Sequence, residues 1–167
     1  MNNKTIVEGL TTLTIADIFY PGYLLFAFIL TLIFIPRKEY KNYFIYGILL
    51  GGLGDFVIVL IFQNLLGIIW FKNQGMFNVL DQIALSPPSW TLTVMLFLYF
   101  LPARRLFLYP YVATWAVTSV GFGYVVRNAG LFDVQPWFYP IPGYFTFLSW
   151  WVAVTWIYTK TRGLLEK

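Results

Sequence analysis

The chain has 167 residues, of which 59% are hydrophobic, 22% are aromatic and only 11% are charged, and its formal net charge is +4. Soluble domains carry about 25% charged residues, and a water-soluble core of this size cannot bury so much apolar surface, so lipid is expected to surround much of the chain. Cysteine and histidine are both absent, which excludes disulfides and thiolate metal sites and removes the commonest general base.

Five apolar runs follow one another along the chain. A transmembrane helix needs roughly 20 residues; the third and fifth runs are shorter than this, but both have aromatic flanks into which their helices are expected to extend. The first run ends at Pro36, and because it lacks a small-residue cleavage pattern we expect it to remain as a membrane anchor. Pro87 and Pro88 stand at the entrance of the third run, where proline fits the first turn of a helix. The sequence therefore predicts an all-α, polytopic transmembrane helix bundle that forms one domain over residues 1–167. Its five predicted spans cover residues 18–35, 43–64, 88–102, 106–126 and 143–160.

Positive charge is concentrated on one side of these spans. Eight of the eleven Lys and Arg residues lie in the loops 36–42 and 102–105 and in the C-terminal tail, and the other three are Lys4, Lys72 and Arg127. Because an excess of Lys and Arg marks the cytoplasmic side, the N-terminus is predicted outside and the C-terminus inside the plasma membrane. The bilayer, and not nucleic acid, is thus the expected partner of the basic residues. The loop charges that carry this prediction are Arg37, Lys38, Lys41, Arg104 and Arg105.

The outer segment 65–87 is too long and too apolar for a plain loop. Apolar residues recur in it at helical spacing, which predicts a short helix in the headgroup layer, with a re-entrant segment as the alternative. The outer loop 128–142 is also apolar and is expected to pack against this first outer segment as an external lid. Arg127 is expected to pair near the outer surface with Asp133 or Asp81. The residues at helical spacing are Met76, Phe77, Leu80 and Ile83.

A single acid, Asp55, interrupts the second span. Gly51 and Gly54 share a helical face with it, and because small residues let another helix approach closely, the carboxyl group is expected to face protein. An acid at mid-membrane costs about 2.5–3.5 kcal/mol on insertion scales, so a hydrogen-bond partner, water or protonation must compensate. Thr114 and Thr118 lie on a similar small-polar stripe of the fourth span. The candidate hydroxyl partners are Thr114, Thr118, Ser119, Ser149 and Thr155.

The functional hypotheses are few, because no P-loop, dinucleotide-binding turn or nucleophile elbow is present and no two carboxylates share a face. No enzymatic activity, cofactor or metal is expected. The leading hypothesis is an interaction, sensing or accessory subunit in which Asp55 is a buried packing residue, with another membrane protein or a second copy as partner. The alternative is a small transporter or channel component that uses Asp55 as a protonatable or cation-binding site. A third hypothesis, binding of a lipid or hydrophobic ligand beneath the external lid, requires a pocket among the outer aromatic residues.

Several short sequence features, spread over most of the chain, resemble those of a known protein family. They are Ile35-Pro36 before basic residues, Pro102-x-Arg104-Arg105, Tyr109-Pro110, Trp115, Gly130-Leu131, Trp137 and Trp150-Trp151. In this layout the chain resembles a family of small, uncharacterised five-span membrane proteins of endospore-forming Firmicutes. The resemblance implies a five-span fold and a Gram-positive plasma membrane, and it implies no functional residue, so Asp55 depends on the physical argument alone.

Overall fold

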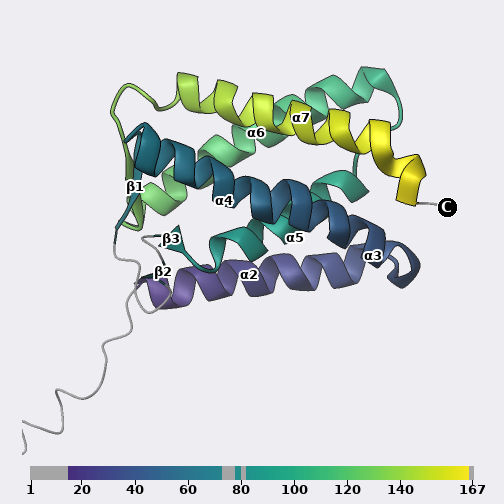
Figure 1. Cartoon of the computed structure of the whole chain (residues 1–167), viewed down its shortest axis with the longest axis horizontal. Helices are drawn as coiled ribbons and strands as arrows, with labels where there is room; N and C mark the ends of the chain where they lie inside the picture. The colour runs from purple at the N-terminus through teal and green to yellow at the C-terminus, as the bar shows by residue number, and fades with distance from the viewer. Residues whose placement is uncertain (1–14, 73–77, 80–81, 166–167) are drawn as a thin grey trace, which may run out of the picture.

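A computed structural model describes residues 15–72, 78–79 and 82–165, and over these residues the chain is an all-α bundle of five helices (Figure 1). The all-α prediction is confirmed. The second helix is continuous but contains two π-helical segments, η1 and η2, on either side of α4. The elements are α2 (Ile15–Phe34), the helix formed by α3 (Arg37–Tyr46), η1 (Gly47–Gly52), α4 (Leu53–Val59) and η2 (Leu60–Leu65), then α5 (Ser86–Tyr99), α6 (Arg105–Asn128) and α7 (Ile141–Leu165).

Two of the helices are long and apolar enough to cross a membrane. They are Ile15–Phe34 and Arg37–Leu65, with 20 and 29 residues. Within the described ranges, the other three helices do not combine that length with that hydropathy. The shortest is α5, whose 14 residues correspond to about 21 Å at 1.5 Å per residue.

The short helix α5 is the centre of the bundle. Every residue from Thr91 to Leu98 is buried, as expected for a helix that is covered on all sides. Leu92 and Met95 pack toward α2, while Phe97 lies in the cluster that α5 forms with α6 and α7. The other four helices therefore shield α5 from its surroundings.

The glycines of η1 let the second helix approach α5 very closely. Gly47, Gly51 and Gly52 are all buried there, and η1 and α5 form the most extensive contact between any two elements. A Cβ atom added at Gly47 would lie 2.7 Å from the carbonyl oxygen of Thr91, and one at Gly52 would lie 2.6 Å from the Thr91 Oγ1. The glycine face of the second span thus packs against another helix.

An aromatic cluster fills the middle of the bundle. Trp151 of α7 is fully buried, and its ring centroid lies 4.4 Å from that of Phe97 and 5.3 Å from that of Trp115. The Trp151 Nε1–H donates a hydrogen bond of 3.0 Å to Ser119 Oγ, and the Ser119 hydroxyl donates to the Trp115 carbonyl at 2.8 Å. This packing ties α5, α6 and α7 together.

Two short antiparallel strand pairs lie at the end of the bundle opposite α3 (Figure 1). β1 (Ile69–Phe71) pairs with β4 (Phe132–Val134), and β2 (Asn78–Val79) pairs with β3 (Gln82–Ile83). The predicted contact between the two outer loops is therefore present. The predicted helix is wrong at Asn78–Val79 and Gln82–Ile83, which pair as antiparallel strands. Met76, Phe77 and Leu80 lie outside the described residues, and Ile83 is buried against Ala16 and Leu131.

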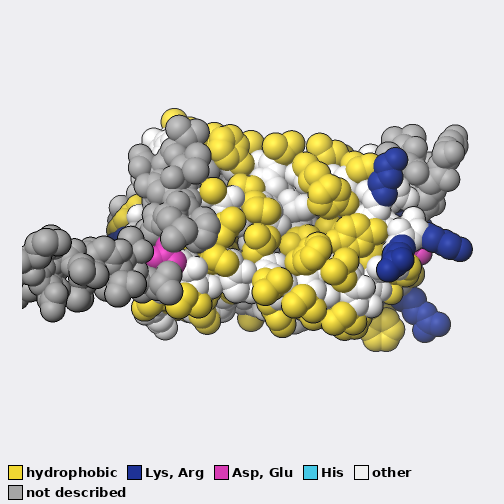
Figure 2. Space-filling model, turned by 90° about the horizontal axis from the view of Figure 1, so that it is seen from below, with side chains coloured by type: hydrophobic (Ala, Val, Ile, Leu, Met, Phe, Trp, Pro, Cys, Tyr) yellow, Lys and Arg dark blue, Asp and Glu magenta, His cyan; other side chains and the backbone are white. Residues whose placement is uncertain are grey.

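Charge and hydrophobicity divide the surface in the manner of a membrane protein. The connections α2–α3 and α5–α6 and the C-terminal end of α7 lie together at one end of the bundle (Figure 1). Figure 2 shows Lys and Arg side chains gathered at that end and hydrophobic side chains covering the middle. Large apolar side chains point outward along the helices, among them Leu25 at 58%, Val117 at 59% and Trp156 at 63% exposure. An apolar surface this extensive is typical of a protein that is in contact with lipid or with other protein.

Candidate functional site

A cavity of about 170 Å³ lies in the half of the bundle next to the strands. All five helices contribute to its walls, and β1 and β4 contribute Phe71 and Phe132. The pocket that the third hypothesis requires is thus present beneath the paired outer loops. Large aromatic side chains line it, among them Tyr20, Phe62, Trp90, Phe122, Phe147 and Trp150.

Asp55 is the acidic group in this cavity wall. It lies on α4, ten residues before the helix ends at Leu65, which is about 15 Å from that end. Ser86, in the first turn of α5, also lines the cavity, and its side chain is a hydrogen-bond partner of the Asp55 carboxyl group. The carboxyl group therefore faces protein, and it lies nearer the strand end than the charged end.

Four of the five hydroxyl residues considered as partners of Asp55 lie elsewhere. Thr114 and Thr118 are on the exposed face of α6, where Thr118 Oγ1 donates to the Thr114 carbonyl at 2.8 Å. Ser149 is exposed, and Thr155 is buried but donates to the Trp151 carbonyl at 2.7 Å.

The fifth candidate, Ser119, follows Thr118 directly in α6 and lines the cavity. One residue is about 100° of helix rotation, which separates an outward-facing hydroxyl from one at the cavity.

Sequence reasoning did not identify Ser86 as the partner of Asp55. The signal was present, since a serine directly before two prolines suits the first turn of a helix. Its meaning depends on α5 packing against η1, a contact between residues about forty positions apart in the chain.

Two polar atoms in the cavity wall have no hydrogen-bond partner. The Tyr20 hydroxyl and the Trp150 Nε1 are buried and make no hydrogen bond within the described part of the chain. Tyr20 is only 7% exposed, and both residues line the cavity. A buried donor without a partner costs about 1–3 kcal/mol, and such groups are rare unless they meet something other than protein. Both groups without a partner therefore belong to residues of the cavity wall, as the Asp55 carboxyl group does.

Two glycines make room for aromatic walls of the cavity. A Cβ atom at Gly54 would overlap the ring of Trp150, and a Cβ atom at Gly123 would overlap the hydroxyl group of Tyr139. Gly54 thus allows the Trp150 ring to lie against α4 directly beside Asp55. The structure brings Gly54 and Asp55 together at the site, whereas Gly51 belongs to the contact with α5.

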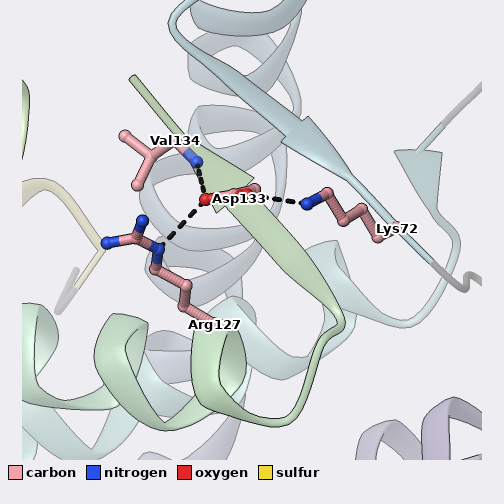
Figure 3. Close-up of polar contacts among 4 residues, drawn as sticks. All are labelled: Lys72, Arg127, Asp133 and Val134. Carbon is pink, nitrogen blue, oxygen red and sulfur yellow. Dashed lines mark hydrogen bonds and ion pairs between the residues drawn. The ribbon is translucent and has the colours of Figure 1, made fainter. Parts of the chain in front are cut away.

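An ion-pair cluster holds the paired loops over the cavity (Figure 3). Asp133 on β4 accepts from Lys72 Nζ at 2.7 Å and from Arg127 Nε at 3.0 Å, and the backbone N–H of Val134 donates to the same carboxylate at 2.9 Å. The predicted pairing of Arg127 with Asp133 is confirmed. The hydrogen bond from Lys72, followed by that from Val134, lowers the pKa of Asp133 from its ordinary value of 3.8 to about 2.

The pairing of β1 with β4 is expected to weaken in acid. Because the pKa of Asp133 is lower in the folded protein, its stabilising effect is complete above about pH 4 and is lost as the pH falls through about 2. Trp70 lies opposite Asp133 in the strand register, so its emission should shift over this pH range. Asp133→Asn should produce the shifted emission at neutral pH already. Glu39→Gln, at the opposite end of the bundle, is the control, and constant Trp70 emission in acid would contradict the expectation.

A second hollow, of about 690 Å³, opens between α2 and the α3–α4 helix. Its walls are apolar side chains such as Phe44 and Leu53. Its polar groups already have partners, because the Thr91 hydroxyl donates to the Pro87 carbonyl at 2.9 Å and the Tyr40 hydroxyl bonds Thr31 at 3.0 Å. The smaller cavity is therefore the better candidate for a specific site.

No group of three or more acidic residues able to hold a metal ion occurs among the residues that the structure describes. Comparisons with models of protein families, with curated proteins and with solved structures find no match. The fold and the site therefore define the class by themselves. Over the residues that the structure describes, the chain is a five-helix bundle with an apolar outer surface, a basic end, and an aromatic cavity toward the opposite end with Asp55 in its wall.

Proposed function

We propose that this protein is a non-enzymatic, five-span integral membrane protein that binds a small, mainly apolar ligand in the cavity beneath its outer loops. In this proposal it is a sensing or accessory subunit, with its N-terminus outside and its C-terminus in the cytoplasm. A Gram-positive plasma membrane is the location that we propose. The observation that carries the proposal is the aromatic cavity with two unpartnered buried donors and one acid in its walls.

The arrangement of the helices supports five spans although only two pass on length and hydropathy. All five run between the basic end and the strand end (Figure 1). The helices α6 and α7 have 24 and 25 residues, which at about 1.5 Å per residue exceeds a hydrocarbon core of about 30 Å. The short α5 has little contact with lipid because other helices surround it, so a lower hydropathy is tolerated there.

The packing below the cavity favours ligand binding over conduction. On the side toward the basic end, Phe97 and Trp151 are fully buried and in ring contact, and Tyr46 belongs to the same core. A transport pathway through Asp55 would have to pass this aromatic cluster. A site that ends on a closed core is suited to holding a ligand presented from the outer side.

A labelling experiment tests the orientation. Because the chain has no cysteine, single cysteines can be introduced at Ala103 and at Trp137, both of which are exposed. A membrane-impermeant maleimide applied to intact cells is expected to label Trp137→Cys and to spare Ala103→Cys until the cells are opened. The reverse pattern would overturn the proposed topology.

A cavity-filling variant tests the ligand site. Ile58 lines the cavity, whereas its neighbour Val57 is 50% exposed on the outer face of the same helix. Calorimetric titration of the protein in nanodiscs with benzene-sized apolar compounds should show saturable binding, after subtraction of empty nanodiscs. Ile58→Phe should reduce this affinity and Val57→Phe should leave it unchanged. Equal effects of the two variants, or no saturable binding to the unmodified protein, would reject the site.

A further inference from the structure

The acid in the cavity lacks a positively charged partner. Ser86 is its hydrogen-bond partner, but a carboxylate offers about four acceptor positions. No Lys or Arg lines the cavity in the part of the chain that the structure describes. The two ion pairs among the described residues both involve Asp133 and not Asp55. Burying a carboxylate is costly unless a cation and further hydrogen bonds compensate for it. A cation from outside the described part of the chain would supply this compensation.

The walls around Asp55 are suited to an organic cation. Trp90 and Phe147 are stacked at 6.0 Å between centroids, and the Trp150 ring lies against Gly54, next to Asp55. All three rings line the cavity. Aromatic faces attract ammonium groups and also pack against the hydrocarbon body that carries them. A metal ion would gain little here, because hard cations require several oxygen ligands.

The size of the cavity limits the ligand. A dry cavity of roughly 150 Å³ accepts benzene, and this one measures about 170 Å³. It therefore has room within its walls for a single ring or a short branched chain. The Tyr20 hydroxyl and the Trp150 Nε1–H have no hydrogen-bond partner among the described residues. A ligand oxygen or another acceptor that reached either group would give it one.

We infer that the cavity beneath the outer loops binds a small lipophilic amine, with its ammonium group on the Asp55 carboxylate and its apolar body between Trp90, Phe147 and Trp150. This inference rests on the proposed function, namely that the cavity holds a ligand, and it adds the chemical class. The ammonium donates to the acceptor positions that Ser86 does not occupy. In this geometry the one acid among the described wall residues has a specific role, which is to bind the ammonium group.

The test compares an amine with a neutral molecule of the same shape. Phenethylamine and phenethyl alcohol are titrated calorimetrically into the protein in phosphatidylcholine nanodiscs at neutral pH, with empty nanodiscs as the blank. The amine is expected to bind at least about tenfold more tightly, as required for a desolvated charge pair. Asp55→Asn should reduce the amine affinity to that of the alcohol. Glu39→Gln, which removes an exposed acid at the other end of the same helix, should change neither affinity.

The outcomes separate this inference from the proposed function. If amine and alcohol bind equally and Ile58→Phe weakens both, the cavity binds ligands but the inferred amine class is wrong. If neither compound binds saturably, the proposed function fails as well. The comparison of the two ligands on the unmodified protein decides the question even if Asp55→Asn does not fold.

Discussion

Replacing Trp151 with alanine is expected to lower the free energy of unfolding by about 3–5 kcal/mol. Trp151 is 0% exposed and packs between Phe97 of α5 and Trp115 of α6. Removing the indole ring leaves a void at a point where three helices meet, and the close contact between η1 and α5 restricts any collapse into it. The hydrogen bond of 3.0 Å to Ser119 is lost as well. Unfolding by sodium dodecyl sulfate in mixed micelles, followed by circular dichroism, measures the change.

The same helix provides the control for this prediction. Trp156 is 63% exposed, so Trp156→Ala is expected to change the free energy of unfolding by only about 0.5 kcal/mol. Trp151→Phe keeps most of the ring volume and removes the hydrogen bond, which contributes about 0.6 kcal/mol on average in membrane proteins, so it should fall between the two. Equal losses for the two alanine variants would show that Trp151 is not the packing centre of the bundle.

The second large effect is expected at Gly51. Gly51→Ala should lower the free energy of unfolding by about 1–3 kcal/mol, the usual cost of overpacking. The added methyl group would overlap the Trp90 carbonyl oxygen and would come within 2.9 Å of the Thr91 Cα. These are backbone atoms, which cannot rotate away as a side chain would, so the two helices must separate.

Gly121→Ala is the same chemical change in an open position. No atom lies within 4 Å of a Cβ added at Gly121, and alanine is favoured over glycine in a helix by up to about 1 kcal/mol. This variant should be neutral or stabilised, measured by the same unfolding assay. If Gly51→Ala were as stable as Gly121→Ala, the proximity of η1 and α5 would not depend on glycine.

Most of the helix positions could be predicted from the sequence, and the boundaries differ for identifiable reasons. The second helix begins at Arg37 and not at residue 43, because hydropathy detects only the apolar part of a helix, whereas helical hydrogen bonding continues through polar residues such as Lys38 and Lys41. The last helix extends beyond residue 160 for the same reason. By contrast, α5 ends at Tyr99 before the predicted 102, since the residue preceding Pro102 is disfavoured in a helix.

The outer segments could be predicted only in part. The apolar character of both loops and the pairing of Arg127 with Asp133 follow from composition and proximity in sequence. The pairing of β1 with β4 joins segments about sixty residues apart, and its hydrogen bonds depend on where α6 and α7 bring the second loop. Spacing along one segment carries no information about that distant partner, so the strand pairing of β1 with β4 was not predicted.

The sequence by itself determined the all-α class, the approximate positions of the helices, the end at which positive charge gathers and the glycine face next to Asp55, because each of these depends on composition or on spacing along one helix. Only the tertiary structure decided that Ser86 faces Asp55 while Thr114 and Thr118 face outward. It also decided that a cavity with two unused donors lies beside that acid. The physical reason is that helix rotation and helix packing set these contacts, and a shift of one residue turns a side chain by about 100°.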